Sequence, residues 1–287
     1  MKHRDQLAAA MLATGIPCPD LPIDDGALHR YHIDGDKRGS QNGWYVLHGD
    51  GVPAGAFGSW KTGLNQSWCA KTPANMSESE RQQHRRSKEQ SKYQRQQEQQ
   101  RRWNKATSRA LSIWDNAGPA SGDHPYLVTK RIPARHLRQH GDELLIPLYD
   151  GDRLVNLQRI GLQGDKRFLF GGKVVGCSSS LGRVSEQIQI VEGWATACTI
   201  FSCTGQHTAA AMSAGNLKAV ALHYQRRYPD LAITIAADND RFTPGNPGIK
   251  HGTEAARAVN GYVVWPTFPN GVDGTDWNDL ANMRLLT

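Results

Sequence analysis

The chain has 287 residues, of which 38% are hydrophobic and 21% are charged, so it is long enough for one to three domains with a real core. No apolar run approaches the roughly 18–20 residues of a membrane helix, and the short apolar stretch after the N-terminus predicts a helix rather than a signal peptide. We therefore expect a cytoplasmic protein with no membrane partner. The five cysteines include no C-x-x-C pair, so neither zinc nor a disulfide framework is expected.

The formal net charge of +7 is concentrated in the middle of the chain. Residues 76–110 carry ten basic and four acidic side chains, residues 111–185 carry ten and seven, and residues 186–287 carry seven and nine. A basic tract that precedes an acidic region suits an enzyme acting on a polyanion such as nucleic acid. A solvated basic surface is the alternative.

Residues 1–75 predict a small α+β domain. A short helix is expected over 8–14, followed by three β-rich runs at 43–48, 54–60 and 66–70 with Asp-Gly turns, which predict an antiparallel meander. The large aromatic residues either form the core of this sheet or, with Lys61 and Lys71 nearby, stack on bases. A core role is favoured for most of them, because so small a unit has few other large apolar groups. They are Trp44, Tyr45, Phe57, Trp60 and Trp68.

Residues 76–110 predict a basic helical linker. Acidic residues at Glu78 and Glu80 suit the first turn of a helix, and the following residues contain neither Gly nor Pro. Apolar residues are almost absent before Trp103, so this helix buries little by itself. The segment is either an exposed helical connector or a partly disordered linker. Its basic residues either contact phosphates or belong to a solvated spacer.

Residues 111–185 predict a basic, mostly antiparallel subdomain. The strand candidates are 144–149, 154–160 and 166–170, with turns at 150–152 and 161–164. The run 126–131 precedes them and ends before Pro133. Basic residues stand at the turns and strand starts.

Residues 186–287 predict an open, Rossmann-like α/β domain with acidic residues after its strands. Glu192 follows the run 188–191, Asp238 and Asp240 follow 232–236, and Asp276 comes shortly after 262–265. Helices are expected at 194–202, 216–228 and 253–259. The carboxyl ends of parallel strands meet at one edge, where gathered carboxylates repel unless a cation lies between them. Hard oxygen ligands of this kind predict Mg²⁺ or Mn²⁺.

These motifs resemble the Toprim domain of DNA primases carried by plasmids, phages and other mobile elements. The matching features are Glu192-Gly193, Asp238-x-Asp240 and the sequence Asp276-Trp277-Asn278-Asp279. Each motif alone is weak, and their order, spacing and strand context carry the resemblance. The segment 124–182 is similar to the basic subdomain before Toprim in bacterial-type primases, and the region around Gly43-Trp44-Tyr45 resembles a module often found further upstream.

The resemblance implies synthesis of short RNA primers from NTPs on single-stranded DNA. Asp238 and Asp240, with Asp276, would hold Mg²⁺ or Mn²⁺, and Glu192 would act as a metal ligand or general acid/base. Asn278 and Asp279 would support the metal ligands, although Asp279 fits equally well as the N-cap of a terminal helix. The cations expected to contact the template or triphosphate are Lys130, Arg131, Lys166, Arg167, Lys173 and Lys250.

Two departures from this family are expected to matter. The zinc ribbon that these primases usually carry is missing, and the sequence leaves no room for a helicase after Asp279. Template selection would then depend on the aromatic N-terminal unit, the basic linker, or a partner such as a replicative helicase or separate replication protein. A Toprim nuclease and a non-catalytic single-stranded-DNA-binding protein are the competing hypotheses.

Overall fold

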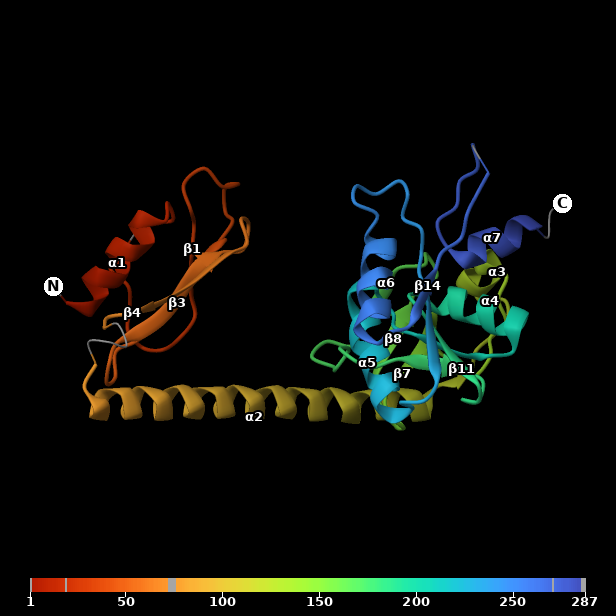
Figure 1. Ribbon diagram of the computed structural model, residues 1–287, viewed down its shortest axis with the longest axis horizontal. Helices are drawn as coiled ribbons and strands as arrows, with labels where there is room; N and C mark the ends of the chain where they lie inside the picture. The colour runs from red at the N-terminus through yellow and green to blue at the C-terminus, as the bar shows by residue number, and fades with distance from the viewer. Residues whose placement is uncertain (1, 19, 72–75, 270, 285–287) are drawn as a thin grey trace. The chain divides into compact units, whose positions relative to one another are not determined.

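The computed structural model describes residues 2–18, 20–71, 76–269 and 271–284. The chain divides into two compact units, Met1–Gln97 and Glu98–Thr287, with the division inside the long helix α2 (Glu78–Asn116) (Figure 1). None of the helices among the described residues combines the length and the apolar composition that are needed to span a bilayer. The domain boundary predicted at residue 75 lies outside the described residues.

The first unit is helix α1 (His3–Ala13) packed on a four-stranded antiparallel sheet. The strands lie in chain order: β1 (His29–Tyr31), β2 (Gly43–His48), β3 (Ala54–Ser59) and β4 (Leu64–Cys69). Leu7 and Met11 of α1 are fully buried against Leu47 and Phe57. The predicted helix and three-stranded meander are confirmed, and β1 is an additional strand whose single apolar residue left no alternating pattern to detect.

The aromatic residues of this unit divide between the two faces of the sheet. Tyr45, Phe57 and Trp68 pack with α1, which confirms the core role for these three. Trp44 is buried on the opposite face, where its ring lies 5.4 Å from that of Trp60. Trp60 keeps 57% of its surface exposed, so it is the one aromatic residue of the set without a core position.

Helix α2 extends six residues beyond the predicted end at residue 110. The described side chains of its first half are exposed apart from the half-buried His84, as expected from its composition. Its last turns carry the buried residues Ala106, Thr107 and Ala110, and the Thr107 hydroxyl donates a 3.3 Å hydrogen bond to the Val155 carbonyl. The end of the predicted linker is therefore part of the core of the second unit, because small side chains there fit against the sheet.

The second unit begins with an antiparallel sheet in the order β5-β6-β7-β8-β9. Its strands are β5 (Gly118–Pro119), β6 (Arg138–His140), β7 (Glu143–Asp150), β8 (Arg153–Ile160) and β9 (Lys166–Phe168). The three predicted strands of this segment are confirmed as β7, β8 and β9.

The run 126–131 was assigned neither to a helix nor to a strand from the sequence, and all of it except Arg131 lies in helix α3 (Pro125–Lys130). Pro125 occupies the first turn, the ring of His124 accepts a 3.3 Å hydrogen bond from the Tyr126 amide, and Arg131 ends the helix in the left-handed conformation with φ 50°. The aromatic and β-branched composition favoured a strand, and the capping residues override it.

The C-terminal sheet has the order β10-β12-β11-β13-β14. Strands β11 (Gln187–Val191), β12 (His207–Ala210), β13 (Ala232–Ala236) and β14 (Tyr262–Val264) are parallel, and β10 (Ser179–Leu181) is an antiparallel edge. The predicted mixed α/β fold with several sheets is confirmed. Strand β12 was missed, because its sequence HTAA has no β-rich pattern.

Helices cover both faces of this sheet. Helices α5 (Leu217–Arg227) and α6 (Pro247–Ala258) pack on Ile188, Ile190, Ile233 and Ile235. Helix α4 (Trp194–Thr204) covers the opposite face and shares a core with the inward residues of β7, which joins the two sheets of this unit. Helix α6 begins six residues earlier than predicted, because Asn246 caps it and Pro247 starts it.

Candidate active site

The strand register brings two of the acidic segments to one edge of the sheet. Val191 pairs with Ala236, which pairs with Val264, so Glu192 and Asp238 both follow the carboxyl ends of paired strands. The third segment is tied to the second by the backbone, since the Asn239 amide donates a 2.7 Å hydrogen bond to the Thr275 carbonyl. The neighbouring residue Asp276 is thereby held beside the loop that carries Asp238.

Asp238 is the most strongly perturbed carboxyl group of the site. Burial raises its pKa from 3.8 to about 8, and the negative charges of Glu192, Asp276 and Asp240 add to this effect, while Lys130 opposes it. Its Oδ1 atom is buried and has no hydrogen-bond partner in the described part of the chain. All three acidic segments therefore act electrostatically on one buried carboxyl group.

Glu192 lies in a similar environment. Burial raises its pKa, the charge of Asp240 raises it further, and a backbone contact with Ala214 and the positive charges of Lys166 and His251 oppose the shift. Its Oε2 atom is buried and, among the residues that the structure describes, finds no partner. Glu192 is therefore held with a free acceptor oxygen next to other carboxylates.

Asp240 is bound by the first turn of helix α6. Its Oδ2 atom accepts a 2.8 Å hydrogen bond from the Gly248 amide, where the positive end of the helix dipole also favours an anion. A Cβ atom at Gly248 would lie 2.4 Å from the Asp238 carbonyl oxygen and 3.0 Å from Asp240 Oδ2. Only glycine allows the helix to approach both aspartates this closely.

Asp276 and Asp279 cap helix α7 (Trp277–Arg284) reciprocally. Asp276 Oδ1 accepts from the Asp279 amide at 2.7 Å, and Asp279 Oδ2 accepts from the Thr275 amide at 3.0 Å and from the Asp276 amide at 3.4 Å. The N-cap is thus Asp276 and not Asp279, which corrects the cap alternative for Asp279. Asp279 instead closes the capping box from inside the first turn.

Lys130 of α3 faces these two carboxylates. Its Nζ atom lies 3.4 Å from Asp276 Oδ2 and 3.3 Å from Asp279 Oδ1. Burial alone would lower the pKa of Lys130, but the two carboxylates raise it. The buried Asn278 amide fixes the same helix end, donating to the Lys130 carbonyl at 2.8 Å and to the Thr199 hydroxyl at 3.0 Å.

Lys166 of β9 also faces the site. Partial desolvation lowers its pKa, the positive charge of Lys130 lowers it further, and Asp276, Asp238 and Glu192 oppose the shift. Its ammonium group lies 5.3 Å from the ring centroid of Tyr126. The basic sheet therefore contributes a cation within range of all three acidic segments.

The other predicted cations are not brought to these carboxylates. Arg167 follows Lys166 on the strand, so it points to the opposite side, where it pairs with Asp165 at 3.3 Å. Lys173 pairs with Asp150 at 2.5 Å and lies 5.6 Å from the Trp103 ring. Two more cations are exposed, one at the end of α3 and one within α6: Arg131 and Lys250.

Sequence reasoning missed four residues at this site. The indole N–H groups of Trp194 and Trp277 are buried without a hydrogen-bond partner in the described ranges. The Tyr126 hydroxyl is buried within range of the charge of Asp276. His251 of α6 acts on Glu192 through its charge. The two tryptophans could have been predicted, because Trp194 directly follows Glu192-Gly193 and Trp277 directly follows Asp276. Nothing in the sequence indicated His251.

A divalent cation fits the donor chemistry of this site. The unpartnered oxygens of Glu192 and Asp238 are hard ligands. Burial raises the pKa of both groups most, and a cation would relieve the repulsion between carboxylates that adds to it. Among the described residues, no three His, Cys, Asp or Glu side chains are gathered closely enough to ligate one ion. The structure therefore contains the charges of a cation site without an assembled ligand shell.

Comparison with known proteins finds a family for this part of the chain. Residues 187–285, which include strands β11 to β14, match the family model described as a Toprim domain. This confirms the resemblance that the acidic motifs indicated.

The relatives extend over most of the chain. A DNA primase TraC of Escherichia coli is 34% identical over 292 aligned residues, which cover 93% of this chain and 27% of that protein. A second Escherichia coli DNA primase TraC is 33% identical, with coverage of 93% and 20%. The chain thus spans 20–27% of the length of these curated relatives.

One solved structure with similarity is the primase fragment of the bacteriophage T7 primase-helicase protein. The TM-score is 0.42 at 14% sequence identity, over 59% of this chain and 75% of that one.

Proposed function

We propose that this chain is the catalytic part of a plasmid-type DNA primase, which makes short RNA primers on single-stranded DNA for the replication of a mobile element. The observation that carries the proposal is the position of Lys166, a cation of the basic sheet in electrostatic range of all three acidic segments of the Toprim domain. The similarity to DNA primase TraC over 93% of this chain supports the same activity.

The proposed chemistry is nucleotidyl transfer to a growing RNA 3′-hydroxyl. Asp238, Asp240 and Asp276 are the proposed ligands of Mg²⁺ or Mn²⁺. Such an ion would supply the positive charge that nucleotidyl transfer requires as negative charge develops on the reacting oxygens. Glu192 either joins the ligands or accepts the hydroxyl proton, and its raised pKa suits proton acceptance.

The cations have separate proposed roles. Lys166 binds the incoming triphosphate, because its ammonium group faces the acidic site and makes no ion pair with another described residue. Lys130 is held between Asp276 and Asp279 and positions the former. The template backbone is contacted by the exposed cations Arg131, Arg167 and Lys250. Lys173 can join them only by leaving Asp150.

The proposed partners are a single-stranded DNA template and NTPs, with a replicative helicase or a separate replication protein to select the start site. The first unit and helix α2 are the parts of this chain available for template capture. The proposed domain limits are 1–75, 76–110, 111–185 and 186–287.

The test is ribonucleotide incorporation on single-stranded DNA with Mg²⁺ or Mn²⁺. We expect template-dependent short products from the wild type and at least about 100-fold less from Glu192→Gln and Asp238→Asn. The control is Asp152→Asn, whose side chain is 88% exposed and pairs with Arg227. Metal-dependent degradation of the template without incorporation would contradict primase activity and favour the nuclease.

A further inference from the structure

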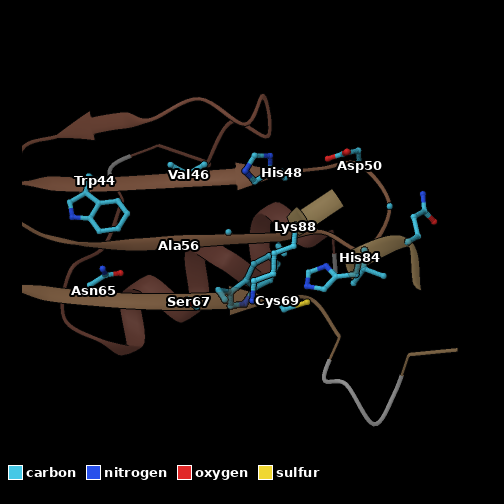
Figure 2. Close-up of a pocket in the computed structure, with 16 residues that line it drawn as sticks. Trp44, Val46, His48, Asp50, Ala56, Asn65, Ser67, Cys69, His84 and Lys88 are labelled. Carbon is cyan, nitrogen blue, oxygen red and sulfur yellow. The ribbon is translucent and has the colours of Figure 1, made fainter. Parts of the chain in front are cut away.

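The first unit contains a groove on the face of the sheet opposite α1 (Figure 2). It lies between strands β2–β4 and the first turns of α2, and its volume is about 580 Å³. This volume is in the range of ligand-binding pockets and suits a nucleotide-sized group. Nothing in the chemistry proposed for the Toprim domain uses this groove.

The floor of the groove is made of small side chains. Val46, Ala56 and Ser67 face each other across the three strands, and the middle strand presents only Ala54, Ala56 and Gly58 to this side. A shallow trough therefore runs along β3, between the larger side chains of the flanking strands.

Aromatic rings close one end of the trough. A Cβ atom at Gly58 would lie 2.9 Å from Cζ2 of Trp44, so the Trp44 indole lies directly over this glycine. Trp60 continues the aromatic surface, with its ring centroid 5.4 Å from that of Trp44 and its plane tilted by 30°. More than half of Trp60 is exposed to solvent, so a planar ligand can reach it.

The opposite end of the trough is predominantly basic. His84 and Lys88 are four residues apart on α2 and therefore project from one side of the helix, near His48 of β2 (Figure 2). Asp50 is the acidic residue at this rim. The same part of α2 carries further exposed cations that do not line the groove: Arg81, Arg85, Arg86 and Lys92.

We propose that this groove binds unstacked bases of a single-stranded nucleic acid. A base stacks at the Trp44–Trp60 end, the small floor admits its ring, and the phosphates lie along His84 and Lys88. Sheet faces that combine aromatic rings with a basic border bind single strands in this way. The inference rests on the proposed function only in taking the bound strand to be the primase template.

The direct test is photocrosslinking of the full chain to a 12-nucleotide oligothymidylate that carries 4-thiothymidine. We expect a crosslinked peptide within residues 43–69. Ser67→Glu places a carboxylate on the exposed floor and should reduce the yield of this peptide about tenfold or more. His84→Ala combined with Lys88→Ala should reduce it several-fold.

The matched control is Arg85→Ala combined with Arg86→Ala, which removes two exposed cations from the same helix outside the groove. It should change the yield by at most about twofold. Thermal unfolding followed by circular dichroism checks that Ser67→Glu is folded. Oligouridylate and a blunt duplex serve as competitors, and we expect the RNA to compete and the duplex not to.

Crosslinks confined to other parts of the chain, or an unchanged yield in folded Ser67→Glu, would overturn the proposal. The Glu192→Gln variant should retain the groove crosslink while losing primer synthesis. Failure of the groove proposal and failure of the primase proposal are therefore distinguishable.

Discussion

The buried carboxylates are the residues on which the site depends, and they work against the stability of the fold. Asp238 has an unpartnered oxygen in the described structure and three acidic neighbours that disfavour its ionised form. Natural sites of this kind keep such a group because a bound ligand needs it.

The first prediction concerns Asp238→Asn in the presence of EDTA. Removing one member of a set of mutually repelling carboxylates should stabilise the metal-free protein at pH 8 by about 1 kcal/mol or more, while primer synthesis is lost. Urea denaturation measures the free energy of unfolding. Destabilisation relative to wild type would contradict the described charge environment.

The second prediction is the pH dependence of the same variant. The folded-state pKa of about 8 lies above the ordinary value of 3.8, so between these pH values the folded protein holds a proton that the unfolded chain has released. The stability that the folded protein gains from holding this proton is present at low pH and is lost as the pH rises towards 8. Without metal, the wild type should lose stability from pH 5 to pH 8 more steeply than Asp238→Asn. Equal slopes would argue against a protonated Asp238.

The third prediction concerns Gly248→Ala. The added methyl group meets the Asp238 carbonyl and Asp240 Oδ2, so we expect about 1–3 kcal/mol of destabilisation and weaker Mn²⁺ binding. Gly215→Ala is the control, because a Cβ there meets nothing within 4 Å. Calorimetric titration with Mn²⁺ makes the comparison, and equal affinities for the two variants would contradict the role of this close approach.

At the residue scale, the sequence predicted which acidic residues meet, because strand ends in a parallel sheet converge. Lys130 and Lys166 were predicted only as contacts for the template or triphosphate, and their positions beside these carboxylates come from the structure. The 2.5 Å contact between Lys173 and Asp150 was not predictable, because it joins residues 23 apart and depends on how the loop after β9 folds back. The individual roles of these residues stay predictions.

At the scale of elements, α7 connects the acidic site to the rest of the domain. Asn278 is only 2% exposed, and its amide joins α7 to both α3 and α4. The helix that Asp276 caps is therefore positioned by a buried hydrogen-bond network, so the network also positions this proposed ligand.

The fourth prediction follows from this network. Asn278→Asp replaces a buried donor by a carboxylate facing the Lys130 carbonyl, which should cost about 1–3 kcal/mol of stability and reduce primer synthesis. Asn282→Asp is the matched control, because its contact with the same carbonyl is longer, at 3.3 Å, and less buried. Equal losses in denaturation midpoint for both variants would contradict the account.

The fifth prediction concerns α2. Its first half has few buried side chains, whereas Ala106, Thr107 and Ala110 are buried. Hydrogen exchange should be fast for amides 85–104 and strongly slowed for 107–116, because tertiary packing supplies most helix stability. Uniform protection along the helix would contradict this division.

Elements with a clear hydrophobic period or turn chemistry were predictable, including the meander of the first unit and the strands β7, β8, β11 and β13. Helix α3 was not, because its composition favours a strand and only the His124–Pro125 start indicates a helix. Strand β12 was not predictable either, because its small residues show no strand pattern and are explained only by their buried position between β10 and β11.

At the scale of the whole molecule, one unit combines a basic antiparallel sheet with an acidic α/β domain that matches the Toprim family model. The sequence predicted this from its strand and turn patterns together with the distribution of charge. The shared core between β7 and α4 explains how the two parts are held together. The similarity to DNA primase TraC covers both parts, although the chain spans only 20–27% of those relatives.

The measurement that tests the account most directly is the fate of the γ-phosphate of ATP during synthesis on single-stranded circular DNA. A primase starts chains from an NTP, so short products of the wild type should retain γ-³²P at their 5′ ends. Glu192→Gln and Asp238→Asn should produce none. Products without the γ-label in the wild type, or equal labelling by Glu192→Gln, would contradict primer initiation by these carboxylates.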